Sequence, residues 1–207
     1  VLAELNNVGV RICFLDGDFQ IDFAEFCMAL SAKTKMIFLC SPNNPTGNLL
    51  KADDILRMIE EFKGVVVVDE AYIEFSARES LAEVAVNSEN LIVLRTLSKA
   101  WGLAGIRIGY CIASKLIIDY LNKIKLPYNV NLLSAYMAIK ALRNPDLMRR
   151  MVREIVAERE FLTVELAKLG FKVFASESNF LLVKIVGAGR IAKRLAKDFG
   201  IIVRDFS

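Results

Sequence analysis

Several polar residues directly follow short apolar segments of the chain, where an open α/β sheet presents its ligand-binding groups. An amine, a carboxylate or a phenol can carry a proton, whereas arginine and hydroxyl groups can bind an anion. The residues are Asn44 in SPNNPTG, Asp69 and Tyr72 in VVVVDEAY, Thr96, Ser98 and Lys99 in LIVLRTLSK, and Arg107 in GIRIGY. We therefore expect these loops to share one site.

The chain contains no histidine, which excludes Ser-His-Asp and Cys-His catalysis. Acid–base chemistry must then fall to Lys, Tyr, Asp, Glu or Cys side chains. The four cysteines show no C-x-x-C spacing, so we predict no metal site and interpret them as thiols in a reducing, cytoplasmic compartment.

The apolar segments predict a mainly parallel sheet with helices on both faces. Expected strands are RICFLD (11–16), KMIFLC (35–40), the valine run of VVVVDEAY, LIVLRT (91–96) and GIRIGYCIA (105–113). Ile55, Ile59 and Phe62 fall on one face of a helix in the segment KADDILRMIEEFK. Four valines without alternation are typical of a strand that is buried on both faces. The fold class is therefore α/β.

After about residue 114 the pattern changes to helices, over 115–125, 130–142 and 145–169, with Gly170 as a helix cap. Two strands, FKVFA and NFLLVKI, a helix over 189–199 and a last strand, IIVRDF, follow. We predict that residues 1–143 form part of a large α/β domain. Residues 144–207 then form part of a smaller α+β domain.

Each candidate residue also has an ordinary structural explanation. SPNNPTG has the composition of a plain turn, Asp69 could cap the turn that follows it, and most lysines are solvated surface charges. Thr96 and Ser98 could be loop hydroxyls, and Arg107 could be an ion-pair partner. The order and spacing of all of them together favour a common site.

The segments SPNNPTG, VDEAY, TLSKA and GLAGIRIGY resemble, in this order, those of the fold-type I (class I/II) aminotransferases, which depend on pyridoxal 5'-phosphate (PLP). The resemblance covers essentially the whole chain and is closest to the histidinol-phosphate aminotransferases. It implies that Lys99 holds PLP as a Schiff base and moves the proton. Asp69 would keep the pyridine nitrogen protonated, and Tyr72 and Asn44 would bind the ring oxygen.

The same resemblance implies that Arg107 and Ser98, together with Thr96, bind the cofactor phosphate. Asn44 and Asn179 would line the substrate pocket. Arg204 would face the substrate, or it is a surface arginine that ends a strand. The amino-terminal arm, phosphate-binding glycine loop and carboxyl-terminal arginine of the family are not in this sequence, so we expect the chain to be a fragment.

The expected reaction converts histidinol phosphate and 2-oxoglutarate to imidazole-acetol phosphate and glutamate. The alternatives are an aromatic-amino-acid aminotransferase, a threonine-phosphate decarboxylase, or a folded fragment without catalytic activity. Hydrophobic residues make up 55% of the chain and the net charge is +3, without a basic stripe or a long apolar run. We therefore expect an amino donor and a 2-oxo acid as partners, neither nucleic acid nor membrane, and, by resemblance, a homodimer.

Overall fold

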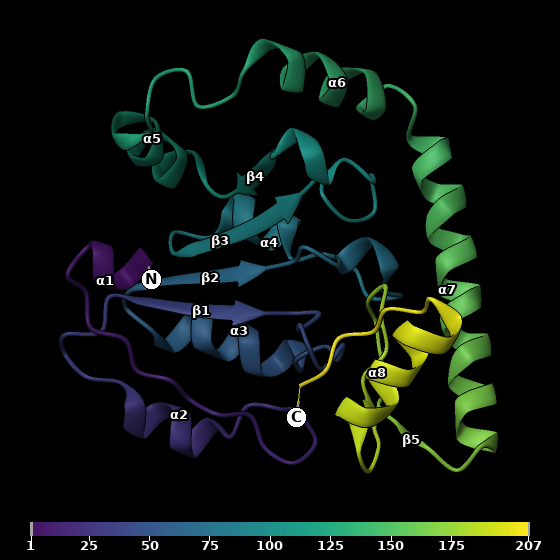
Figure 1. Ribbon diagram of the computed structural model, residues 1–207. Helices are drawn as coiled ribbons and strands as arrows, with labels where there is room; N and C mark the ends of the chain where they lie inside the picture. The colour runs from purple at the N-terminus through teal and green to yellow at the C-terminus, as the bar shows by residue number, and fades with distance from the viewer. Residues whose placement is uncertain (1, 207) are drawn as a thin grey trace.

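The computed structural model describes residues 2–206 and contains a four-stranded sheet (Figure 1). Its strands are β1 (Met36–Cys40), β2 (Val65–Asp69), β3 (Leu91–Thr96) and β4 (Gly109–Ile112), and they lie side by side in the order in which they occur along the chain. β1, β2 and β3 run parallel, whereas β4 is antiparallel to β3. The predicted fold class, a mainly parallel sheet with covering helices, is confirmed.

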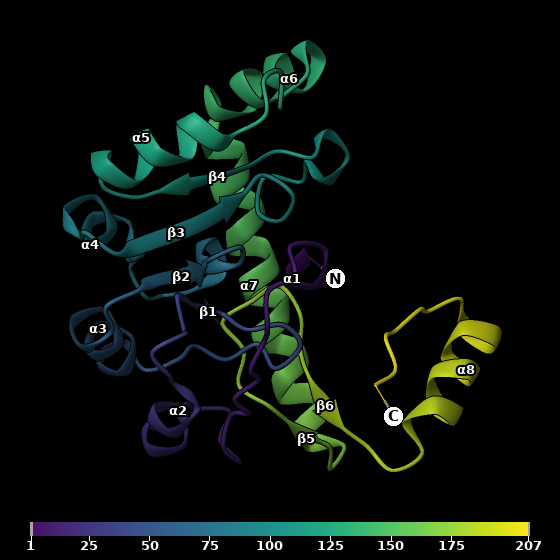
Figure 2. The same cartoon turned by 90° about the vertical axis from the view of Figure 1, so that its left-hand side faces the viewer.

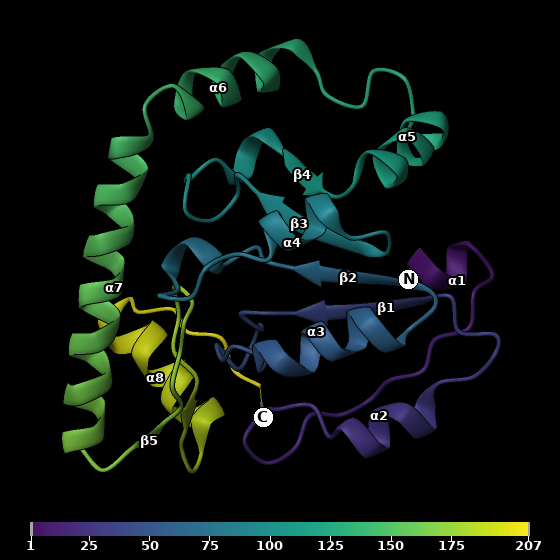
Figure 3. The same cartoon turned by 180° about the vertical axis from the view of Figure 1, so that it is seen from behind.

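Helices cover both faces of this sheet. α2 (Phe23–Ala29), α3 (Ala52–Glu61) and α4 (Ala82–Asn87) pack on one face, where Val66 and Val68 are buried. α5 (Lys115–Ile124) packs on the other face, against Val67. Figure 3 shows α3 lying along β1 and β2. The valine run is thus buried from both sides, which explains why its residues do not alternate with polar ones.

The long helix α7 (Pro145–Lys168) runs past the carboxyl ends of the strands (Figure 1). Pro145 occupies its first turn and Gly170, at φ +84°, follows its end, as the sequence predicts. Met148, Val152 and other apolar residues of α7 pack against Tyr72, Phe75 and Ala100. α7 therefore closes the end of the sheet to which the candidate residues belong.

The remaining elements are shorter or lie at the edges. They are α1 (Leu2–Leu5), the 3-10 turns η1 (Ile73–Phe75) and η2 (Ala104–Ile106), α6 (Leu132–Leu142), the strands β5 (Lys172–Val173) and β6 (Val183–Lys184), and α8 (Ala188–Phe199). β5 and β6 form a separate antiparallel pair. α8 stands apart from the sheet and its covering helices in Figure 2.

Two predicted strands are wrong. Residues 11–16 are extended but form only one bridge, between Leu15 and Ile21, and residues 201–206 form no strand. Ile12 and Phe14 of the first segment and Ile202 of the second are largely exposed. β5 and β6 are also shorter than FKVFA and NFLLVKI. An apolar segment becomes a strand only where a neighbour pairs with its backbone along several residues, and residues 2–206 supply no such continuous pairing here.

No helix within residues 2–206 is both long and apolar enough to cross a membrane.

Replacement of Ile55 by alanine should destabilise the sheet, because this residue of α3 is fully buried against β1 and β2. We expect the free energy of unfolding to fall by about 2–5 kcal/mol in a denaturant titration. Ile124→Ala is the matched control, since Ile124 is 77% exposed on α5. It should change stability by no more than about 0.5 kcal/mol, and an equal loss in both variants would contradict this core assignment.

Candidate functional site

The candidate residues from three loops gather at the carboxyl ends of β1, β2 and β3. Asn44 follows β1, Asp69 ends β2, and Lys99 lies three residues beyond the end of β3. Backbone pairing continues into these loops, since Ser41 N–H donates to the Asp69 carbonyl at 3.0 Å and Glu70 N–H to the Leu94 carbonyl at 3.0 Å. The parallel register therefore carries the loops to the same edge of the sheet.

Asn44, Tyr72 and Lys99 form the centre of this site. Asn44 Nδ2 donates a hydrogen bond to the Tyr72 hydroxyl at 3.0 Å. Lys99 Nζ lies 5.0 Å from the centre of the Tyr72 ring, close enough for a cation–π interaction. The Tyr72 side chain is buried, whereas Lys99 is exposed. A buried phenol and an exposed amide thus lie beside an amine that a ligand can reach.

Asp69 caps the turn that follows β2 and is also available to a ligand. Its Oδ1 accepts a hydrogen bond from Ala71 N–H at 2.9 Å, so it does cap the turn that follows β2. Within residues 2–206 no hydrogen bond to Oδ2 is present, and the side chain is half-buried. The turn therefore fixes the orientation of the carboxylate while leaving one oxygen for a ligand.

Thr96 ends β3, and Ser98 and Arg107 lie on the loop between β3 and β4. Ser98 N–H donates to Thr96 Oγ1 at 3.0 Å, and Leu97 N–H donates to the Ile108 carbonyl at 3.0 Å. Arg107 is exposed, has φ +54°, and donates from Nη1 to the Ala104 carbonyl at 3.0 Å. The structure brings the two ends of this loop together, but the Arg107 guanidinium contacts the Ala104 carbonyl rather than Ser98.

The two candidate residues from the carboxyl-terminal part of the chain, Asn179 and Arg204, differ in their position relative to the site. Asn179 is exposed, but the next residue, Phe180, contacts Tyr72 edge-on, with the ring centres 5.3 Å apart. Phe180 therefore reaches the site, and sequence reasoning missed it. Arg204 lies on the exposed segment 201–206 with its guanidinium 5.4 Å from the Phe206 ring, and it is not in contact with Tyr72 or Lys99.

The SPNNPTG loop is braced by the segment 176–180. Glu177 N–H donates to the Gly47 carbonyl at 2.7 Å. Gly47 has φ +79°, and a Cβ at this position would lie 2.6 Å from Ser176 Oγ, so only glycine fits here. Arg159 of α7 donates to the Phe75 and Ser178 carbonyls at 3.1 and 2.9 Å. The loop that carries Asn44 is thus held by residues more than 100 positions away.

Cys40 lies next to the site without being suited to nucleophilic chemistry. Its thiol donates to the Pro42 carbonyl at 3.4 Å. Burial raises the pKa of the Cys40 thiol, and the negative charge of Asp69 adds to the increase. The thiol is therefore protonated at neutral pH.

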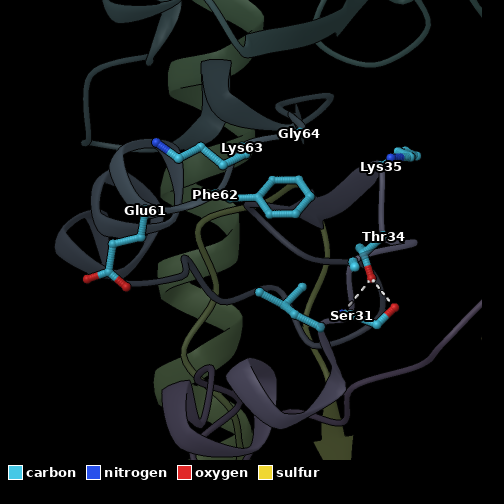
Figure 4. Close-up of a pocket in the computed structure, with 9 residues that line it drawn as sticks. Ser31, Thr34, Lys35, Glu61, Phe62, Lys63 and Gly64 are labelled. Carbon is cyan, nitrogen blue, oxygen red and sulfur yellow. Dashed lines mark hydrogen bonds between the residues drawn. The ribbon is translucent and has the colours of Figure 1, made fainter.

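A pocket of about 410 Å³ lies elsewhere (Figure 4). Residues 30–32, 34–35 and 61–64 line it, and these residues precede β1 and β2. It therefore lies at the amino ends of the strands, opposite the candidate residues. No group of three potential metal-ligating side chains occurs in the described part of the chain.

A buried cluster of charged side chains lies beside the site, and sequence reasoning missed it as well. Arg95 Nη1 donates to Glu70 Oε2 at 3.0 Å, and Arg95 Nη2 donates to Glu74 Oε1 at 3.1 Å. Burial raises the pKa of Glu74, and the Arg95 guanidinium only partly offsets this effect. Burial alone would lower the pKa of Arg95, but interactions led by that with Glu74 raise it.

The chain belongs to a known family. The family model "Aminotransferase class I and II" matches residues 1–207. Histidinol-phosphate aminotransferases from Parabacteroides distasonis and Flavobacterium johnsoniae are 45% and 43% identical to it, over 100% and 99% of this chain and 60% and 59% of their own lengths. The chain is therefore a member of the class I and II aminotransferases and spans about three fifths of these relatives.

Solved structures agree with this membership. Histidinol-phosphate aminotransferase from Sinorhizobium meliloti, in complex with pyridoxal-5'-phosphate, has a TM-score of 0.81 and 28% identity, over 94% of this chain and 55% of that one. L-Threonine-O-3-phosphate decarboxylase from Porphyromonas gingivalis has a TM-score of 0.74 and 28% identity, over 85% and 56%. The fold thus occurs in proteins with different reactions.

The raised pKa of Glu74 predicts a pH-dependent stability difference between the wild-type chain and Glu74→Gln. Just above the ordinary pKa of 4.5, the folded chain holds a proton that the unfolded chain has lost. The free energy of unfolding contributed by Glu74 therefore falls as pH rises through this window.

Denaturant titrations from pH 4 to pH 7 should show the wild-type chain losing stability relative to Glu74→Gln. Glu160→Gln, an exposed carboxamide replacement on α7, controls for the loss of one charge. A stability difference that stays constant or changes in the opposite direction would reject the assigned shift.

Proposed function

We propose that this chain forms part of a PLP-dependent aminotransferase that acts on histidinol phosphate and 2-oxoglutarate. The observation that carries the proposal is the contact of Lys99 with the Asn44–Tyr72 pair at the carboxyl ends of the parallel strands. Family membership and the similarity to histidinol-phosphate aminotransferases support the same reaction.

The residues present fit PLP by the chemistry of their donors. The cofactor would supply an aldehyde for an amine and a ring that accepts electrons from the substrate α-carbon. Lys99 offers the exposed amine, while Asn44 and Tyr72 offer an amide and a phenol to the ring oxygen. Asp69 has one carboxylate oxygen without a partner in the described residues and would favour a protonated pyridine nitrogen.

Each proposed role follows from what the side chain can do. Lys99 would hold the cofactor and would move a proton to and from the substrate α-carbon, because it is the one amine beside Tyr72 among the described residues. Arg107, Ser98 and Thr96 would hold the phosphate, with Arg107 turning from the Ala104 carbonyl toward it. The half-buried Phe180 packs on the edge of Tyr72 and would exclude water.

These loops contain few residues that could bind the substrate. Asn44 and Asn179 are proposed to face the substrate, and Arg204 to reach its phosphate after moving from Phe206. The structural similarity to L-threonine-O-3-phosphate decarboxylase supports a decarboxylase as the second candidate function. Both candidates share the proposed cofactor residues and differ in which bond at the α-carbon breaks.

We also propose a homodimer, by analogy with the family, in the cytoplasm. The four cysteines are free, which agrees with a reducing compartment. Residues 1–143 are proposed to belong to a large domain and residues 144–207 to a small one. In support, β5 and β6 do not pair with the four-stranded sheet.

Addition of PLP to the purified chain should produce a visible absorption band that Lys99→Ala abolishes, because the amine forms the covalent adduct. Lys123→Ala is the matched control, since Lys123 Nζ lies 4.9 Å from the Tyr120 ring centre on α5 but far from the carboxyl ends of the strands. Absence of a band in the wild-type chain, or its survival in Lys99→Ala, would overturn the proposed cofactor.

Offering histidinol phosphate, aromatic amino acids and threonine phosphate in turn, each with 2-oxoglutarate, tests the substrate. We expect glutamate to form with histidinol phosphate, and Lys99→Ala to slow this by at least about 10²-fold through loss of the proton carrier. Glutamate formed only from an aromatic amino acid, or carbon dioxide released from threonine phosphate, would reject this substrate in favour of a rival.

A further inference from the structure

The charged cluster around Arg95 joins the ends of β2 and β3 through side chains that are almost fully buried. Side-chain exposure is 1% for Glu70, 10% for Glu74 and 14% for Arg95. Glu70 also accepts hydrogen bonds from Ser80 Oγ at 2.5 Å and from Leu81 N–H at 2.8 Å. One guanidinium thus bridges two carboxylates, and a hydroxyl and a backbone amide complete the partners of Glu70.

The members of this cluster alternate along the chain with the proposed site residues. Glu70 directly follows Asp69, Glu74 lies two residues beyond Tyr72, and Arg95 precedes Lys99 by four residues. The backbone between them is also paired, since Ile73 N–H donates to the Glu70 carbonyl and Phe75 N–H to the Tyr72 carbonyl. A shift of the Arg95 side chain would therefore shift the segments that carry all three site residues.

Stability alone does not explain why charges occupy this place. Well-packed apolar residues in place of a buried ion cluster are often as stable or more stable, because desolvation of the charges offsets their attraction. Arg95 Nε is buried without a hydrogen-bond partner in the described residues, which adds to this cost. The planar guanidinium group of Arg95 holds two carboxylates in fixed directions at once, which the ammonium group of a lysine would not do.

We propose that Arg95, acting through Glu70 and Glu74, is a positioning residue that fixes Asp69, Tyr72 and Lys99 relative to one another for the cofactor. The inference rests on the proposed function. Arg95 itself lies on the side of the sheet packed by Val93, away from Leu94 and Ile92, and it is not among the residues proposed to touch the cofactor.

Arg95→Lys keeps the positive charge and removes the fork, and it is the direct test. Two readouts are taken on the purified chain with PLP: the dissociation constant of PLP and the pKa of the visible band in a pH titration. We expect PLP to bind about 10-fold to 10²-fold more weakly. The pKa of the band should rise, because a displaced Tyr72 stabilises the ring oxygen less well.

Val93→Ala is the matched control for a purely structural role. Val93 is fully buried on the same strand, two residues before Arg95, and does not belong to the charged cluster. It should lower the melting temperature of the chain without PLP while leaving the PLP dissociation constant and the pKa of the band unchanged. Glu74→Gln, which keeps the shape of the side chain, should move both readouts in the same direction as Arg95→Lys but less.

The outcomes separate this inference from the proposed function. If the wild-type chain forms no band, the proposed function fails and the inference fails with it. If the wild-type band forms and depends on Lys99, but Arg95→Lys and Glu74→Gln match the wild-type chain in both readouts, the inference alone is overturned. A lower melting temperature in Arg95→Lys with unchanged readouts, as in Val93→Ala, would equally overturn it.

Discussion

The parallel pairing of β1, β2 and β3 is the constraint on which the candidate site depends. Cys40 pairs with Asp69, and Asp69 pairs with Leu94, so β1 and β2 end at the same level and β3 continues for two more residues, to Thr96. Because parallel strands need long connections, the residues that follow each strand are far apart in the sequence and close in space. The hydrogen bonds from Ser41 and Glu70 extend this pairing by one residue into the loops.

The pairing brings the loops together, but other segments must hold them. Glu177 pairs with Gly47, and Arg159 ties α7 to Phe75 and Ser178 through two backbone carbonyls. These contacts join the carboxyl-terminal third of the chain to the loops after β1 and β2. The contact of Phe180 with Tyr72 follows from the same arrangement, since the bracing segment ends at Phe180. The same segment therefore both holds the loops in place and covers the site.

How much the sequence could predict depended on whether the signal was local. The valine run of β2 and the long helix α7 with its proline and glycine ends were predicted correctly, because periodicity and capping act within one segment. Residues 11–16 have the composition of a strand but form only the single bridge from Leu15 to Ile21 within residues 2–206, and composition does not report on partners.

The features of the site also divide into those that the sequence could predict and those that it could not. Motif order predicted that the loops with Asn44, Tyr72 and Lys99 meet, because topology determines it. The burial of Arg95 between Glu70 and Glu74 depends on side-chain directions in one strand, in the residue that follows another strand, and in a 3-10 turn. An arginine within an apolar strand was the one available signal, since an interior charge requires partners.

The structural and chemical explanations of Asp69 turn out not to exclude each other. Acceptance of the Ala71 N–H restricts rotation of the carboxylate, and a carboxylate with one oxygen fixed presents the other in a single direction. A freely rotating side chain would have to lose that freedom on binding a ligand, at a cost in conformational entropy. The turn thus makes the loop more stable and prepares the carboxylate for binding at once. The same reasoning applies to Tyr72, whose hydroxyl is already oriented by Asn44 before any ligand arrives.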